Sequence, residues 1–168
     1  MTLPSPPSAE STQVQIIRRQ FEPALTMFET LIRTCPETLW VSNPYGHPLW
    51  KRCLHAFESL DYFLNDFGVY CFEGIDKEVS PEFDQVDRQS LTRQEMVTYF
   101  SRVREKLVSA LSNLTSDQLQ AYSVISSEYT YLDIFLLQLR HLSLNLGCCD
   151  EVLAVNGYPR IGWTGYKE

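Results

Sequence analysis

Basic residues are scarce in this chain, and their scarcity limits the partners it can bind. Lysine and arginine number 14 against 21 aspartates and glutamates, which gives a formal net charge of -7 and an isoelectric point near 5.0. Nucleic-acid binding needs a basic face that neutralises phosphates, and anionic membrane surfaces attract clusters of lysine and arginine. We therefore expect neither a nucleic-acid partner nor a membrane partner.

Targeting and membrane-spanning segments are also missing. The first eight residues, MTLPSPPS, have neither the basic region nor the apolar region of a signal peptide. The most apolar stretch, residues 132–146, is interrupted by charged and polar side chains and is too polar to span a bilayer. These features favour a cytoplasmic protein.

The cysteines form no disulfide framework and no zinc-binding motif. Their number is odd, their spacing is irregular, and no CxxC pair is present. This pattern is typical of reduced cytoplasmic thiols. The five residues are Cys35, Cys53, Cys71, Cys148 and Cys149.

Common catalytic and nucleotide-binding motifs are absent as well. The chain has no Gly-x-Ser-x-Gly elbow, no phosphate-binding glycine loop and no dinucleotide fingerprint. No segment shows the alternating pattern of a strand, and no internal repeat is found. The 168 residues, with 44% hydrophobic and 21% charged content, instead have the composition of one globular domain. We expect residues 1–10, rich in proline and serine, to be disordered, and residues 11–168 to form the domain.

Four segments carry apolar residues at helical spacing. They predict helices near residues 12–34, 48–67, 92–114 and 130–156, and hence an all-α protein with an up-and-down four-helix bundle. The connections 35–47 and 68–91 are predicted as loops, and the acid-rich stretch 73–87 as a solvated one.

Several residues predict where these helices begin, bend or end. Thr92 and Glu95 form a capping box, Thr130 is an N-cap, and Gly157 is a stop signal. Pro23 falls inside the first helix and predicts a kink or a break. A short helical turn is expected to start at Ser116.

The segment 130–156 carries polar residues on its apolar face. On a helical wheel they share the arc of the buried leucines, because positions three and four apart lie on one side of a helix. Burying such groups unpaired costs about 1–3 kcal/mol each. The pattern therefore indicates either an internal hydrogen-bond network or the wall of a pocket that contains ligands. The inward polar residues are Gln138, His141, Asn145 and Cys148.

His55 is the second histidine of interest, and its wheel leaves two interpretations open. It shares a polar face with Ser59, Tyr62 and Asp66, away from the apolar stripe of its helix. If His55 meets His141, that face lines a cleft between helices, but a surface histidine accounts for the same wheel. His47 is either a further ligand or a loop residue.

The order and spacing of these pieces resemble the DinB-like superfamily of metal-binding four-helix proteins. The resemblance extends from about residue 14 to Trp163. It is carried by three motifs, Trp50-x4-His55-x4-Leu60-Asp61-x2-Leu64, Thr92-x2-Glu95 and Leu139-Arg140-His141-x5-Gly147.

The resemblance implies a divalent-metal site, with zinc or nickel as the ion. The family's three histidine ligands correspond to His55, His141 and Asn145, and an additional histidine that often precedes the last one corresponds to Leu144. An asparagine carbonyl is a weak ligand for these metals. We therefore expect weak or partial occupancy.

Two functions compete at this point. The first is a metal-dependent enzyme of the thiol-transferase, isomerase or hydrolase type, as in relatives that use a low-molecular-weight thiol. The second is a degenerate, non-catalytic bundle that binds a small molecule or a protein. A shared fold does not by itself transfer an activity.

A homodimer is expected in either case. The expectation rests on the resemblance and on apolar residues that lie off the main stripes, such as Phe63, Phe72 and Val108.

Overall fold

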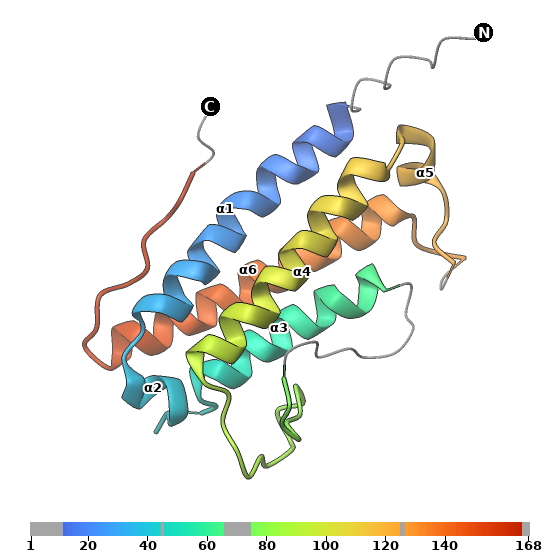
Figure 1. The fold of residues 1–168 in the computed structure, drawn as a ribbon. Helices are drawn as coiled ribbons and strands as arrows, with labels where there is room; N and C mark the ends of the chain where they lie inside the picture. Colours follow the sequence, from blue (N-terminus) through green and yellow to red (C-terminus); the bar gives the residue numbers. More distant parts are fainter. Residues whose placement is uncertain (1–11, 45, 66–74, 125–126, 166–168) are drawn as a thin grey trace, which may run out of the picture.

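The computed structural model describes residues 12–44, 46–65, 75–124 and 127–165, and in these residues the protein is all-helical. An isolated bridge between Tyr122 and Thr130 is the only β-pairing in this part of the chain. The disorder predicted for residues 1–10 lies outside the described residues. The helices are α1 (Thr12–Thr34), α2 (Glu37–Val41), α3 (Leu49–Leu64), α4 (Arg93–Asn113), α5 (Ser116–Gln120) and α6 (Tyr131–Val155) (Figure 1).

The four long helices begin and end close to the predicted residues. The Thr92 hydroxyl accepts a hydrogen bond from the Glu95 amide while the Glu95 carboxylate accepts one from the Thr92 amide, as a capping box requires. Thr130 and Asp133 form the same arrangement at the start of α6. The predicted end of α3 at residue 67 lies outside the described residues.

One local prediction was wrong, and of the two outcomes predicted at Pro23, a kink or a break, the break does not occur. The connection 35–47 contains a short helix, α2, whose Leu39 and Trp40 are buried. Pro23 does not break α1, which continues from Thr12 to Thr34. Proline removes one backbone hydrogen bond, but Phe21, Leu25 and Phe28 are fully buried on both sides of it, and this packing keeps the helix continuous.

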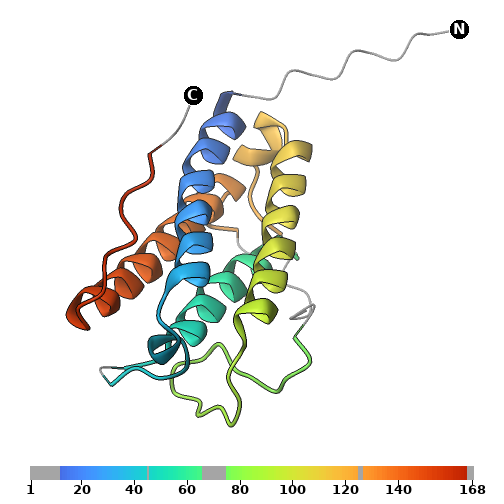
Figure 2. The same cartoon turned by 60° about the vertical axis from the view of Figure 1, so that its left-hand side comes forward.

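The long helices form a closed ring of contacts. α1 packs against α4 and α6, and α3 packs against the same two helices. Figures 1 and 2 show the four helices side by side from two directions. A column of aromatic rings fills the centre: Phe28 of α1 lies 4.9 Å from Phe57 of α3, which lies 5.0 Å from Phe100 of α4 (ring centroids).

The chain does not alternate up and down as predicted, because α3 and α4 run parallel. Phe57 contacts Phe100, and Asp61, one turn later, accepts a hydrogen bond from Lys106 at 2.8 Å. Figure 1 shows both helices starting at the same end of the molecule. Residues 75–92, the described part of the connection between them, lie beside α3, where Asp87 pairs with Lys51 and Phe83 contacts His55.

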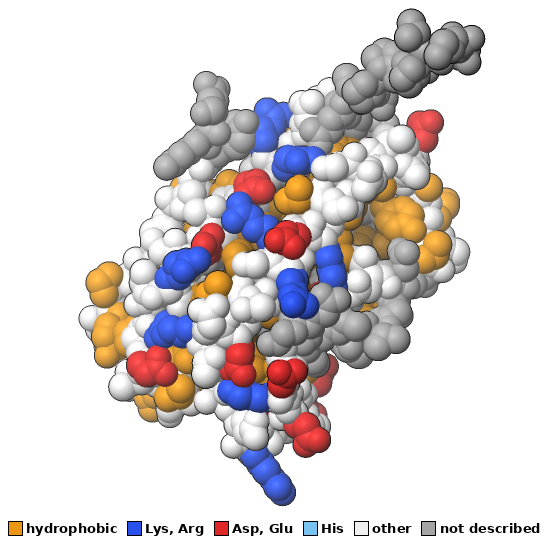
Figure 3. Space-filling model, viewed as in Figure 1, with side chains coloured by type: hydrophobic (Ala, Val, Ile, Leu, Met, Phe, Trp, Pro, Cys, Tyr) orange, Lys and Arg blue, Asp and Glu red, His pale blue; other side chains and the backbone are white. Residues whose placement is uncertain are grey.

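α1 and α6 also run parallel, since Phe21 lies 6.3 Å from Phe135 (ring centroids) and Thr34 and Leu153, near the other ends of the two helices, line one pocket. α1 and α4 are antiparallel. Arg104 of α4 pairs with Glu22 of α1 at 2.7 Å, and Arg18 donates to Ser112 near the opposite ends of the two helices. The face over α1 and α4 carries interleaved Lys or Arg and Asp or Glu side chains rather than a field of one sign (Figure 3).

One arginine ties the start of α4 to the end of α1. Arg93 donates to the carbonyls of Ile32, at 2.7 Å, and of Cys35, and its guanidinium lies 5.2 Å from the Trp40 ring. The last carbonyls of a helix have no partner within the helix, so these bonds satisfy groups that would otherwise be buried unpaired. They also fix the angle at which α4 starts.

The Glu95 carboxylate at the start of α4 is expected to stabilise the fold, and its pKa shows over which pH range. Burial alone would raise the pKa of Glu95, but hydrogen bonds from Lys77 and Thr92 outweigh it and hold this pKa below its ordinary value. A carboxylate with a lowered folded-state pKa stabilises the fold above its unfolded pKa, about 4.3, and this stabilisation is lost as the pH falls below it.

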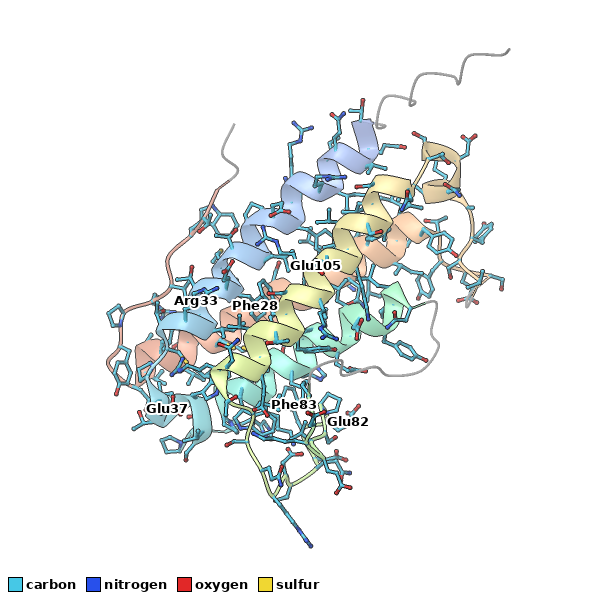
Figure 4. All side chains as sticks on the ribbon, viewed as in Figure 1. Phe28, Arg33, Glu37, Glu82, Phe83 and Glu105 are labelled. Carbon is cyan, nitrogen blue, oxygen red and sulfur yellow. The ribbon has the colours of Figure 1, made fainter. Side chains whose placement is uncertain are left out.

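We expect Glu95→Gln, which keeps the cap geometry, to lower the free energy of unfolding by about 1 kcal/mol at pH 7. The difference should shrink towards zero near pH 3. Urea unfolding at both pH values measures it, with the exposed Glu105→Gln of the same helix as the control (Figure 4). Equal stabilities of wild type and Glu95→Gln at pH 7 would contradict the assignment.

Candidate functional site

Two histidines from different helices meet in the groove between α3 and α6. The Nε2 atoms of His55 and His141 lie 3.1 Å apart, and the ring centroids are 5.0 Å apart at an interplanar angle of 74°. The two helices are antiparallel, since Ser59 of α3 donates to Gln138 of α6 one turn away at 3.1 Å. The structure therefore brings together the two histidines that the sequence singled out, and both are half-buried.

Asn145 joins the same point. It lies one turn after His141, is only 5% exposed, and places Nδ2 at 3.0 Å from His141 Nε2. The same Nδ2 also donates to the His141 backbone carbonyl at 3.0 Å. Three side-chain nitrogens from two helices thus converge on one position.

Protein groups alone do not satisfy this cluster. A bond between two neutral imidazoles needs one N–H donor and one acceptor, and the Asn145 amide, as placed, makes His141 Nε2 the acceptor. Among the described residues, no group makes a hydrogen bond of good geometry with the buried Nδ1 atom of either His55 or His141. A buried polar atom left unpaired costs about 1–3 kcal/mol, so the pair is held in place at an energetic cost.

Both imidazoles are neutral at neutral pH. Burial lowers the pKa of His55, as does the nearby Arg52, although Glu82 and the Pro81 backbone act in the opposite direction. Burial also lowers the pKa of His141, and the neighbouring His55 adds to that effect. Neutral imidazole is the form that binds a metal ion or accepts a hydrogen bond.

An aromatic ring from the α3–α4 connection covers one member of the pair, His55. The ring of Phe83 lies 4.5 Å from that of His55, and the Arg52 guanidinium lies 5.4 Å from the Phe83 ring. His47 stacks on the same ring at 4.6 Å. The structure therefore places His47 against Phe83 and not beside His141.

Sequence reasoning missed this cover, because it assigned residues 73–87 to a solvated loop. Figure 4 shows Phe83 and Glu82 next to each other on the connection that runs beside α3. The one signal in the sequence was an aromatic residue inside an acidic stretch, which does not say what the ring contacts.

A buried ion pair holds the connection against α3. Lys51 Nζ lies 2.6 Å from Asp87 Oδ2 and also donates to the Gln85 carbonyl, while Asp87 Oδ1 accepts the Ser80 amide at 2.7 Å. The two charged side chains are only 3% and 7% exposed. They fix both ends of the segment that carries Phe83, so the position of this cover is built into the fold.

The converging nitrogens have the spacing of metal ligands. Two ligand atoms at roughly 2.0–2.1 Å from a zinc ion lie about 2.9 Å apart at a right angle and about 3.3 Å apart at a tetrahedral angle. The observed separations of 3.1 and 3.0 Å fall between these values. The imidazoles therefore fit such an ion, whereas Asn145 fits it only with its amide turned so that the oxygen faces the pair.

The third residue distinguishes this cluster from a strong metal centre. Within the described residues, no group of three or more His, Cys, Asp or Glu side chains is placed to hold a metal ion. Turning the Asn145 amide would also break its bond to the His141 carbonyl. Both facts argue against a tight three-ligand metal site at this position.

Comparisons with protein-family models, with curated proteins and with solved structures found no match. The DinB-like resemblance therefore remains a prediction from motif order. No helix in the described part of the chain is both long and apolar enough to cross a membrane.

The Lys51–Asp87 pair yields a test of how the cover is held. Removing one partner of a buried ion pair leaves an uncompensated charge and costs about 3–5 kcal/mol. We expect Asp87→Asn to lower the free energy of unfolding by about this amount, and the double variant Lys51→Met/Asp87→Asn to recover part of it. Urea unfolding of the four proteins of the cycle measures the coupling.

The exposed residue Asp84 of the same connection provides the control, since Asp84→Asn should change stability by less than about 0.5 kcal/mol. Additive effects of the Lys51 and Asp87 substitutions would show that the two side chains do not depend on one another.

Proposed function

We propose that this chain is a DinB-like four-helix bundle that binds a divalent metal ion, zinc or nickel, at His55, His141 and Asn145. We further propose that it is a metal-dependent enzyme of the thiol-transferase, isomerase or hydrolase type. The single observation that carries the proposal is the convergence of the two Nε2 atoms at 3.1 Å, with Asn145 at 3.0 Å.

The bound metal would supply a Lewis acid with an open position that lowers the pKa of a water or a substrate thiol. His55 and His141 hold it through Nε2, and their lowered pKa values keep them in the neutral, ligating form. Asn145 serves as a weak ligand or orients a bound water. Phe83 lies against one side of the site and excludes solvent there.

Glu82 adds charge to this site from the edge of the cover. Its carboxylate acts on His55 strongly enough to oppose the effect of burial on that pKa, and its side chain is exposed. A negative group at this position favours a cation between the histidines. Arg52, whose guanidinium lies over the Phe83 ring, has the contrary effect on the pKa of His55, so the two charges partly cancel.

The competing candidate is a non-catalytic binding module, and one observation favours it. The His55–His141 and Ser59–Gln138 contacts already connect the polar residues of the groove without a ligand ion. In this case the groove is a hydrogen-bonded interface between α3 and α6. The metal content of the protein separates the two candidates.

Zinc affinity tests the proposal directly. Elemental analysis should use untagged protein, because a purification tag can load nickel into such a site. We expect substoichiometric zinc in the wild type and a competition titration that gives weak binding. Asn145→His should tighten binding by at least about tenfold, since it replaces an amide with an imidazole donor.

Two variants control that titration. His141→Gln should abolish binding, while Asn113→His, an added histidine at an exposed position on α4, should leave the affinity unchanged. Tight zinc binding that survives His141→Gln would place the metal elsewhere. An affinity unaffected by Asn145→His would remove Asn145 from the site.

We also propose that the protein is a cytoplasmic homodimer that associates through the outward face of α6. Phe63 and Val108, which the sequence suggested for the interface, are half-buried, and Phe72 lies outside the described residues. Leu136 and Leu144, two turns apart on α6, are instead 53% and 66% exposed. Exposed apolar patches commonly mark interfaces. The described cysteines are free, which supports a reducing compartment.

Light scattering over a dilution series tests the dimer. We expect twice the chain mass of 19.5 kDa for the wild type and the single chain mass for Leu144→Glu. Val86→Glu, at a 95% exposed position on the α3–α4 connection, should remain dimeric. A wild type that is monomeric at micromolar concentration would contradict the proposal.

A further inference from the structure

A second concave site lies on the other side of α6 from the histidine pair. It is a pocket of about 450 Å³ between α1, α6 and the chain segment that follows α6. Leu139 and Ser143 of its wall flank His141 by two residues in each direction, which places them about 160° around the helix from it. None of the residues that line the pocket belongs to the histidine site.

The floor of the pocket is apolar. Two helices contribute it, each with residues spaced along one face, and most of the exposed lining is carbon. Small-molecule sites are typically clefts of roughly 300–1,000 Å³ with mainly apolar walls, and this pocket has both properties. The apolar residues of its two helical walls are Pro23, Ala24, Met27, Leu139 and Leu146.

The third wall of the pocket is the chain segment after α6, and specific hydrogen bonds and ion pairs hold it against that helix. Arg160 pairs with Asp150 at 2.9 Å and with Glu151 at 2.7 Å, and the Ile161 amide donates to the other oxygen of Asp150 at 2.7 Å. This wall continues through Trp163, which is 89% exposed while the other two tryptophans are buried. An indole on the rim of an apolar pocket offers a flat surface for a ring.

A glycine keeps the pocket open. Gly147 lies in the middle of α6, where glycine costs about 1 kcal/mol relative to alanine. A Cβ at this position would meet no atom within 4 Å, so close helix packing does not explain it. Because glycine has no side chain, it lets a ligand in the pocket approach the helix backbone closely.

The charges of the wall favour an anion. Among the described residues that line the pocket are two arginines and one carboxylate, Asp150, whose oxygens both accept hydrogen bonds, one of them from the Arg160 guanidinium. Arg160 also pairs with Glu151, which is exposed and lies outside the lining. The charge of Asp150 is therefore compensated within the wall. Arg19 of α1 adds a further positive charge to the lining.

We propose that this pocket binds a small, flat, apolar molecule that carries one negatively charged group. The ring system lies on the apolar floor beside Gly147 and Trp163, and the anionic group faces Arg19. The site is separate from the metal centre and does not depend on whether a metal binds there.

Two fluorescent probes test this proposal. They are 8-anilino-1-naphthalenesulfonate and N-phenyl-1-naphthylamine, which share a ring system but differ in the sulfonate. We expect saturable binding of one sulfonated probe per chain, with the same affinity in the presence of a chelator or zinc. Gly147→Leu, which fills the pocket with a better helix former, should weaken both probes by at least about tenfold.

Matched variants separate shape from charge. Ser101→Leu adds the same side chain at an exposed position of α4 outside the pocket and should leave both affinities unchanged. Arg19→Met should weaken the sulfonated probe by about threefold or more and leave the neutral probe unchanged. Near-ultraviolet circular dichroism of each variant confirms native packing, because the sulfonated probe also binds partly unfolded states.

Several results would overturn the proposal. Probe binding that is unaltered by Gly147→Leu, or that does not saturate at one per chain, would mean that the pocket is not the binding site. Equal loss of both probes in Arg19→Met would refute the role of charge. Probe binding that appears only as a dimer dissociates on dilution would show that a second copy of the chain, and not a small molecule, covers this face.

Discussion

The parallel direction of α3 and α4 is the constraint on which the candidate site depends. α3 has 16 residues and is about 24 Å long, so the chain must travel that distance back before α4 can begin beside the start of α3. The described part of this connection, residues 75–92, packs against α3 through Lys51 and His55. Phe83 therefore reaches the histidine pair because of the topology, and an alternating arrangement with a short turn would leave that edge uncovered.

The cover is held by charges that are themselves buried. A lysine and an aspartate with little access to water cost more to desolvate than a surface pair does, and their attraction offsets this cost only when both are present. The Lys51–Asp87 pair is thus better suited to specifying where the connection lies than to stabilising the domain as a whole. The same reasoning applies to Arg93, whose donated bonds make the end of α1 and the start of α4 depend on one another.

The histidine pair can satisfy its hydrogen bonds in two ways that exclude one another. Without a metal, His55 Nε2 donates to His141 Nε2, and Asn145 donates to the same acceptor. With a metal, both Nε2 atoms are ligands, and their mutual bond and the Asn145 bond are lost. Part of the metal's binding energy therefore replaces bonds that the protein already makes. An imidazole in place of Asn145 would remove one of these competing bonds and add a ligand. Asn145 would therefore weaken metal binding in two ways, as a poor ligand and as a competing hydrogen-bond donor.

Local periodicity predicted the helices and part of the site, but not how the pieces are assembled. The inward phase of Gln138, His141 and Asn145 follows from the spacing of α6 alone, and the structure buries Gln138 and Asn145 and half-buries His141. The direction of α4 relative to α3 and the contact of Phe83 with His55 join residues far apart in the chain, and no single-helix pattern contains them. Leu144, a leucine next to the buried Asn145, shows the same limit, because it is 66% exposed.

The surroundings of α6 explain why the spacing of its apolar residues predicted some buried positions correctly and others wrongly. One face packs in the core, a second carries the polar residues that meet α3, a third lines the pocket with α1, and Leu136 and Leu144 face outward. A helix that is apolar on nearly every side is either buried or in contact with several partners. In a domain of this size α6 cannot be enclosed on all sides by the other helices. Its apolar residues outside the core are therefore the ones available to the small molecule and the second subunit proposed above, whereas α1 and α4 have a more clearly amphipathic pattern.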